Sequence, residues 1–245
     1  LPTLAELRSL RAQAYVLIAY GHLWQEGVRD LAKLEHVAWL AAQHLVECYQ
    51  RSMRPRWNWF ESRMTYANAV LPHALFVAAR RWPTEPFRGI ASESFDFLRA
   101  QSVTDATFWP VGNNGWYSHG ESKAEYDQQP LEAVTFADAA LAAHAVTGDG
   151  RHLASLRCAH AWFHGRNSVG LPLCDVASGA CCDGLQHDGV NRNQGAESTL
   201  AFLWTELHLR EALAAESGEP LLRPALERLD RSVPAAIAAD CHTRP

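Results

Sequence analysis

Alanine and leucine recur at helical spacing along most of this chain, and no stretch alternates polar and apolar residues as a half-buried strand would. A Gly- and Asp-containing turn at residues 147–150 joins two such stretches, so neighbouring helices are expected to be antiparallel. The sequence therefore predicts an all-α fold of stacked antiparallel helical hairpins. The predicted helices cover residues 7–20, 31–50, 71–82, 92–101, 130–146, 151–165, 196–215 and 224–236.

Composition limits the class of protein. Of the 245 residues, 48% are hydrophobic and 20% are charged, which is typical of a folded globular protein, and we predict one domain over residues 1–245. The net charge of −5 and the lack of a basic run argue against nucleic acid as the main partner. No stretch approaches the ~18 consecutive apolar residues that a membrane span needs.

The six cysteines are scattered rather than arranged as a disulfide scaffold. We therefore expect a reducing compartment and a cytoplasmic location. The chain starts at Leu1 without a methionine or a basic-then-apolar leader, and we interpret this start as a trimmed or processed end.

Two connections are unusually long and polar. Residues 103–130 and 166–195 are rich in Gly, Asn, Asp, Trp and His, and long structured loops in compact domains are often functional. We expect a helical scaffold whose polar and aromatic loops gather at one end.

The first candidate site stretch is RWNWFESRMTYANAVLP, residues 56–72. Trp57, Trp59 and Tyr66 crowd around Glu61, and apolar surroundings disfavour the charged form of a carboxyl group. Glu61 is therefore the acid that we most expect to be protonated near neutral pH. The alternative, equally weighted, is that these aromatic residues are ordinary core and that Glu61 faces water.

The second stretch is FWPVGNNGWYSHGESKAEYDQQPLEA, residues 108–133. The turn that begins at Asn113 is expected to aim Trp116 outward. Free N–H groups at the start of the following helix favour an ionised carboxylate just before it, although simple helix capping by that carboxylate is the alternative. The polar residues in front of this helix are Asp127, Gln128 and Gln129.

The third stretch is LPLCDVASGACCDGLQHDGVNRNQGAEST, residues 171–199. Glu197 falls in the first turn of the next helix, where a carboxylate is favoured. Further polar side chains that could contact a ligand are Asp183, His187, Asn191, Asn193 and Gln194.

These three stretches together favour a ligand rich in hydroxyl groups. Aromatic faces cover the C–H faces of a sugar ring, while amides and carboxylates bind its hydroxyls. Glycoside cleavage needs one protonated and one ionised carboxyl group, so we predict Glu61 as the acid and Asp127 or Glu197 as the base. The subsites would be lined by Trp57, Trp59, Trp116 and Tyr66.

Other chemistries have less support. No P-loop or GxGxxG motif follows a strand, and we predict no cofactor. Cys174, Cys181, Cys182 and His187 include soft metal ligands, but they lack a C-x-x-C pair, and we predict no metal. Among the histidines, His119 and His187 lie in the polar loops and are the candidate bases. The others that we weighed are expected to be ordinary helix-face residues, namely His36, His44, His73, His144, His160 and His208.

An ordered series of motifs resembles a bacterial family of helical domains of the six-hairpin glycosidase type, found alone or attached to glycosyltransferase modules. The motifs are W-N-W-F-E, T-Y-A-N-A, P-V-G-N-x-G-W, Y-D-Q-Q-P-L-E-A, T-G-D, A-W-F-x-G-R-N and N-x-N-Q-G-A-E-S-T, between about Trp57 and Leu207. The resemblance implies an (α/α) toroid and a connection with carbohydrate. Its motif positions include Glu61, Asp127, Gln128, Gln129, Asn193, Gln194 and Glu197.

The leading prediction is thus a glycoside hydrolase-like domain acting on an oligosaccharide or polysaccharide. A non-catalytic domain that holds a glycan for a glycosyltransferase module is the first alternative, and a sugar epimerase or isomerase with a His base is the second. A full toroid of twelve helices usually needs more than ~300 residues, by the ordinary lengths of helices and connections. The resemblance therefore implies either an incomplete ring or a missing N-terminal part.

Overall fold

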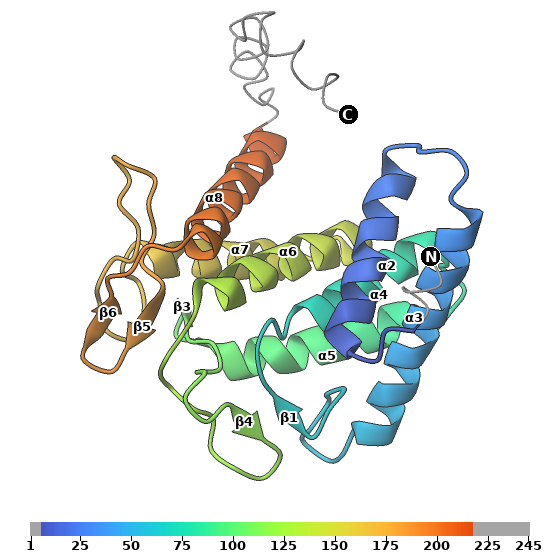
Figure 1. Cartoon of the computed structure of the whole chain (residues 1–245), viewed down its shortest axis with the longest axis horizontal. Helices are drawn as coiled ribbons and strands as arrows, with labels where there is room; N and C mark the ends of the chain where they lie inside the picture. The colour runs from blue at the N-terminus through green and yellow to red at the C-terminus, as the bar shows by residue number, and fades with distance from the viewer. Residues whose placement is uncertain (1–5, 218–245) are drawn as a thin grey trace, which may run out of the picture. The chain divides into compact units, whose positions relative to one another are not determined.

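The computed structural model describes residues 6–217, and the helix predicted at 224–236 lies outside them. The chain divides into two compact units, Leu1–His208 and Leu209–Pro245. Of the second unit, the structure describes residues 209–217, the end of the last helix. The single domain predicted over 1–245 therefore stays a prediction. The helices are α2 (Leu10–Gln25), α3 (Ala32–Ser52), α4 (Val70–Arg81), α5 (Phe87–Ser102), α6 (Pro130–Thr147), α7 (Arg151–Phe163) and α8 (Ala196–Ser217) (Figure 1).

Consecutive helices pair as hairpins. α2 packs on α3, α4 on α5, and α6 on α7, while α4 also packs against both α2 and α6. Pro130 opens α6 and Gly148 ends it in the left-handed conformation, with φ 71°, before the chain turns into α7. The all-α class predicted from the sequence is confirmed.

Within residues 6–217, three short two-stranded antiparallel sheets lie in the connections, where the sequence predicted no strands. β1 (Arg63–Met64) pairs with β4 (Tyr117–Ser118), and β2 (Val103–Thr104) pairs with β3 (Thr107–Phe108). β5 (Gly184–Gln186) pairs with β6 (Gly189–Asn191). The β1–β4 pair joins the loop before α4 to the loop before α6.

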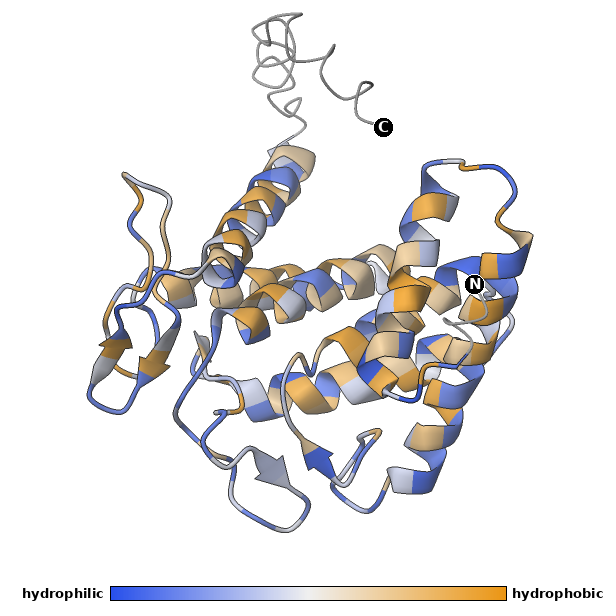
Figure 2. Ribbon diagram, in the orientation of Figure 1, coloured by the Kyte–Doolittle hydropathy of each residue, from blue (hydrophilic) through white to orange (hydrophobic). Residues whose placement is uncertain are grey.

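Small residues allow the helices to approach closely. Ala133, Ala137, Ala140 and Ala143 on α6 are fully buried, as is Ala74 on α4. Figure 2 shows hydrophobic and polar residues interspersed along the helices. The buried residues of α4 and α6 are mostly small or apolar, which allows these two helices to pack closely.

Within the described residues, no helix is long and apolar enough to cross a membrane.

Candidate functional site

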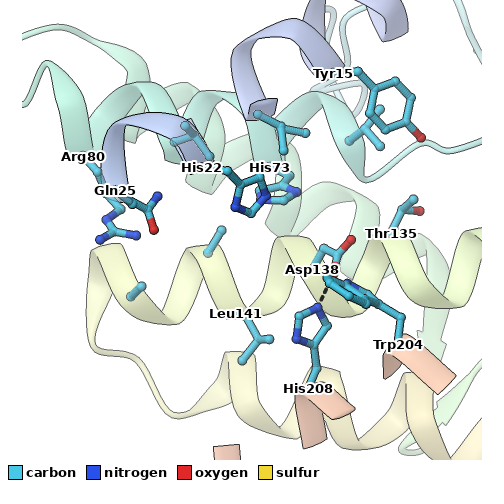
Figure 3. Close-up of a pocket in the computed structure, with 15 residues that line it drawn as sticks. Tyr15, His22, Gln25, His73, Arg80, Thr135, Asp138, Leu141, Trp204 and His208 are labelled. Atoms are coloured by element: carbon cyan, nitrogen blue, oxygen red, sulfur yellow. Dashed lines mark hydrogen bonds and ion pairs between the residues drawn. The ribbon is translucent and has the colours of Figure 1, made fainter. Parts of the chain in front are cut away.

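A pocket of about 330 Å³ lies between α2, α4, α6 and α8 (Figure 3). The lining residues recur every three or four positions, so each of these helices turns one face toward the same space. α2 contributes Tyr15, Ile18, His22 and Gln25; α4 contributes Val70, His73, Val77 and Arg80; α6 contributes Thr135, Asp138, Leu141, Ala142 and Ala145; and α8 contributes Trp204 and His208.

Histidines and one carboxylate form the polar part of the pocket. His208 Nε2 lies 2.7 Å from Asp138 Oδ1, and His22 and His73 lie side by side above this pair (Figure 3). Burial lowers the pKa of His73 to about 4, with Asp138 opposing and the two neighbouring histidines adding to the shift. His73 is thus a neutral imidazole near pH 7, able both to donate and to accept a hydrogen bond.

Two aromatic rings border the pocket. Tyr15 is 46% exposed and Trp204 is 50% exposed, and the Trp204 ring meets His208 edge-on at 5.2 Å. Burial raises the pKa of the Tyr15 phenol, and the charges of Glu132, Asp138 and Glu197 raise it further. The charges of acidic groups on α6 and α8 therefore act on the Tyr15 phenol.

Arg11 organises the loop before α4. It is 6% exposed, its Nη1 lies 2.9 Å from Glu61 Oε2, and its Nε donates to the Tyr66 carbonyl at 2.5 Å. The guanidinium also lies 4.9 Å from the centroid of the Tyr66 ring. Glu61 was expected to be protonated among apolar groups. Its side chain is instead 33% exposed and forms an ion pair.

Glu132, on the first turn of α6, is the buried acid that the sequence analysis missed. It is 6% exposed and accepts hydrogen bonds from the backbone N–H of Ala67, from Asn68 N at 3.3 Å and from Asn68 Nδ2 at 3.1 Å. Burial raises its pKa to about 7, against the opposing effect of these bonds and of the Arg11 charge. Its signal in the sequence was one acid among the apolar residues of PLEAVTFA.

The tryptophans of the first stretch do not line a cleft. Trp57 is 1% exposed and Trp59 is fully buried, and both pack against Phe97. Trp57 also donates to the Glu61 carbonyl at 2.8 Å. The prediction that these two rings line sugar subsites is wrong for this conformation, because neighbouring side chains cover their faces. Trp116 is half-buried and donates to Asn113 Oδ1 at 2.6 Å.

Gln128 holds loops together instead of facing a ligand. It is fully buried, and its side chain donates to the Glu125 carbonyl and to Ser168 Oγ, both at 2.8 Å, and accepts from Trp162 Nε1 at 2.9 Å. Its predicted role in substrate binding is therefore corrected, since protein groups use its polar atoms.

Asp127 does not cap α6. The N-cap is Gln129, whose side chain makes no capping bond. Asp127 has φ 50° and is half-buried, and its carbonyl accepts from Asn113 N at 3.0 Å. The left-handed backbone at this position explains why the chain can turn directly into the helix.

The third stretch is anchored by Asp183. Its Oδ1 accepts from Gly195 N at 2.7 Å, and its Oδ2 accepts from Asn193 Nδ2. A hydrogen bond from Ser198, followed by those from Gly195 and Asn193, lowers the pKa of Asp183. Asp183 thus fixes the entry to α8.

The other predicted residues of this stretch lie on its exposed side. Asn191 Oδ1 accepts from Asn193 N at 3.1 Å, and His187 meets Tyr126 edge-on at 5.1 Å. Gln194 and Glu197 are exposed. Of these, Glu197 is the one whose charge reaches the pocket, through Tyr15.

The predicted convergence of Glu61, Asp127 and Glu197 is therefore not found in this pocket, which is lined by other residues. His73 and His208, expected to be ordinary helix-face residues, line it together with Asp138. His119, expected as a base, is exposed and packs on Trp57 at 5.4 Å.

Comparison of the chain with protein-family models and with curated proteins finds no match. The resemblance to six-hairpin domains therefore rests on the quoted motifs.

Proposed function

We propose that this chain is a carbohydrate-active domain that binds a saccharide in the pocket between α2, α4, α6 and α8, with glycoside hydrolysis as the leading reaction. One observation carries the proposal: two half-exposed aromatic rings, Tyr15 and Trp204, border a space lined by imidazoles, a carboxylate and an amide. Its volume of about 330 Å³ is at the lower end of the ~300–1,000 Å³ common for ligand sites. That size suits a short saccharide.

The packing of the helices supports an (α/α) toroid as the architecture. α2, α4, α6 and α8 are alternate members of the helical series, and all four face the pocket. In a toroid of hairpins, alternate helices form the inner ring and the loops before them gather at one end. The proposed ring would extend beyond the described helices.

Glu132 is the proposed general acid, in place of Glu61. It does not line the pocket itself but lies one helical turn before the lining residue Thr135 on α6, and to act it would exchange its hydrogen bonds with Ala67 and Asn68 for one to the glycosidic oxygen. With a pKa raised to about 7 by burial, it holds its proton at neutral pH in an appreciable fraction of molecules. Glu197 is the proposed base, because it is exposed and its charge acts on the same Tyr15 phenol as that of Glu132. In hydrolysis the acid would protonate the glycosidic oxygen, and the carboxylate would either activate a water or attack the sugar carbon.

A sugar epimerase or isomerase is the second candidate. The specific observation in its favour is the 2.7 Å contact between His208 Nε2 and Asp138 Oδ1, because a carboxylate bound to one ring nitrogen orients an imidazole for proton transfer. His208 would be the base in this case, instead of His119 or His187.

The test is a glycan array and an oligosaccharide-turnover screen on the purified chain, with Glu132→Gln, His208→Gln and Trp204→Ala beside it. Leu200→Ala is the matched control, since Leu200 is a 65% exposed residue of the same helix as Trp204. For a hydrolase, Glu132→Gln should reduce turnover ~10²–10⁴-fold with binding retained. Trp204→Ala should weaken binding, and Leu200→Ala should change neither.

Loss of an epimerisation activity in His208→Gln would instead establish the second candidate. Binding without any turnover in the parent protein would make the chain a glycan-holding domain for a glycosyltransferase. If the parent binds no glycan, or if Trp204→Ala binds as the parent does, the saccharide pocket is wrong.

A further inference from the structure

A second cluster of chemically reactive side chains lies on the opposite side of α8 from the pocket. Trp204 and His208 face the pocket, whereas Glu206, between them in sequence, points toward α7. Each residue of an α-helix is rotated by about 100° from the one before it, so residues 204 and 208 lie on one side and residue 206 on the other. The cluster is thus separate from the proposed saccharide site.

The two histidines of this cluster lie at the C-terminal end of α7, His160 in its last turn and His164 as the residue that follows it. His160 and His164 are four residues apart, which places them one turn from each other, and their ring centroids are 4.6 Å apart. Glu206 reaches them from α8, with its Oε2 2.5 Å from His160 Nε2. One ligand atom from each of the three residues lies within 4.8 Å of the others.

A thiol completes the group. Cys174 Sγ lies 3.5 Å from His164 Nδ1, and the nearby Glu206 charge adds to the effect of burial in raising the pKa of the Cys174 thiol. Donor atoms bound tetrahedrally to zinc lie ~3.3–3.8 Å from one another, given metal–ligand distances of about 2.0–2.3 Å. Of the observed spacings, the 3.5 Å between Cys174 Sγ and His164 Nδ1 falls in this range. The 2.5 Å between His160 and Glu206 is shorter, and the ligand atoms of the three-residue group spread over as much as 4.8 Å, so the side chains would have to rotate to bind one ion.

We infer that His160, His164, Glu206 and Cys174 form a binding site for a divalent transition metal ion, with Zn²⁺ as the best fit. Two imidazoles, one carboxylate and one thiolate match the nitrogen, oxygen and sulfur donors that zinc accepts in tetrahedral geometry. The prediction of no metal overlooked this set because its members are spread over α7, the residue after α7, α8 and the loop at Cys174. Cys174 does contribute, but its predicted companions do not: Cys181 is fully buried and donates to the Cys182 carbonyl.

Such an ion would connect α7, α8 and the loop at Cys174. Since Glu206 lies between Trp204 and His208 on α8, fixing its carboxylate also fixes the rotation of the helix that presents these two residues to the pocket. The role inferred for the metal is therefore structural. With all four of these side chains bound to it, a tetrahedral ion would have no open position for a substrate.

The experiment strips the full chain with a chelator and then titrates it with Zn²⁺ alone by calorimetry, with Co²⁺ absorption as a second readout. We expect one ion per chain, a rise in Tm with Zn²⁺, and a thiolate-to-cobalt charge-transfer band. His164→Ala and Cys174→Ser should weaken binding by more than the ~10–100-fold that outer-shell changes cost at metal sites. Cys174→Ser should also lose the band.

Cys158→Ser and Cys182→Ser are the matched controls and should keep both the affinity and the band. His164 is exposed, so its variant should remain folded without metal, which far-UV circular dichroism checks. Failure of the parent to bind a stoichiometric ion would overturn the inference. So would a band that persists in Cys174→Ser, or one that disappears in Cys182→Ser.

Discussion

The loops before α4, α6 and α8 and the pocket between the helices contain the same residue types and use them in opposite ways. In the loops, Trp59 is fully buried, and the side-chain amide of Gln128 forms hydrogen bonds with three protein groups. In the pocket, Trp204 is half-exposed and Gln25 is exposed. Both regions are rich in aromatic, amide and acidic side chains, but the tryptophan and the glutamine of the pocket keep open to solvent what Trp59 and Gln128 bury against other protein groups.

This difference shows how a polar motif can be mistaken for a binding site. A buried amide or carboxylate must find hydrogen-bond partners, and a loop that folds back on itself supplies them from its own backbone. Glu132 and Asp183 illustrate this, since each accepts bonds from backbone N–H groups at the start of a helix. Such residues stabilise the fold whether or not they also meet a substrate.

The largest difference in stability is expected between substitutions of Trp59 and of Trp204. Trp59→Ala removes a fully buried ring and is expected to lower the free energy of unfolding by ~3–5 kcal/mol. Trp204→Ala removes a ring that is 50% exposed and should cost less than ~1 kcal/mol while weakening saccharide binding. Urea denaturation of both variants measures this, and equal losses of stability would remove the distinction between the two regions.

Glu132 should make stability depend on pH in a specific direction. Its pKa is raised from 4.5 to about 7 in the folded chain, mainly by burial. Between these values the folded state holds more protons than the unfolded state, so the free energy of unfolding falls as the pH rises. When Glu132 is fully ionised, the free energy of unfolding is lower by on the order of 3 kcal/mol than when it is protonated.

The measurement compares urea denaturation of the parent and of Glu132→Gln from pH 4 to pH 8. The difference between them should be smallest at the acid end and should shift in favour of the variant as Glu132 ionises. Glu121→Gln, at an exposed loop position, is the control for general charge effects. A parent-minus-variant difference that does not vary with pH would contradict the raised pKa.

A smaller difference in stability is expected between substitutions of Gln128 and of Gln25. Gln128→Ala removes the acceptor of Trp162 Nε1 and one donor each from Ser168 Oγ and the Glu125 carbonyl, and we expect a loss of ~2 kcal/mol in the free energy of unfolding. Gln25→Ala, at the exposed edge of the pocket, should lie within ~0.5 kcal/mol of the parent. Thermal unfolding compares the two, and a stable Gln128→Ala protein would show that the buried amide does not hold the loops.

The sequence determined the helical class and most of the helices, because periodicity, Pro130 and Gly148 act locally along the chain. Its candidate base Glu197 is exposed in the first turn of α8 and stays a prediction. It could not show that Trp57 and Gln128 are buried, since the identity of a residue does not tell whether other parts of the chain cover its side chain.

The tertiary structure alone decided which faces of α2, α4, α6 and α8 share a pocket and which side chains of α7 and α8 meet around His160. Asp138 and His208 are 70 positions apart in the chain, and His160 and Glu206 are 46 apart. Contacts at such separations depend on how helices rotate and pack against one another, which is fixed by side-chain interdigitation across the whole core and not by any local pattern.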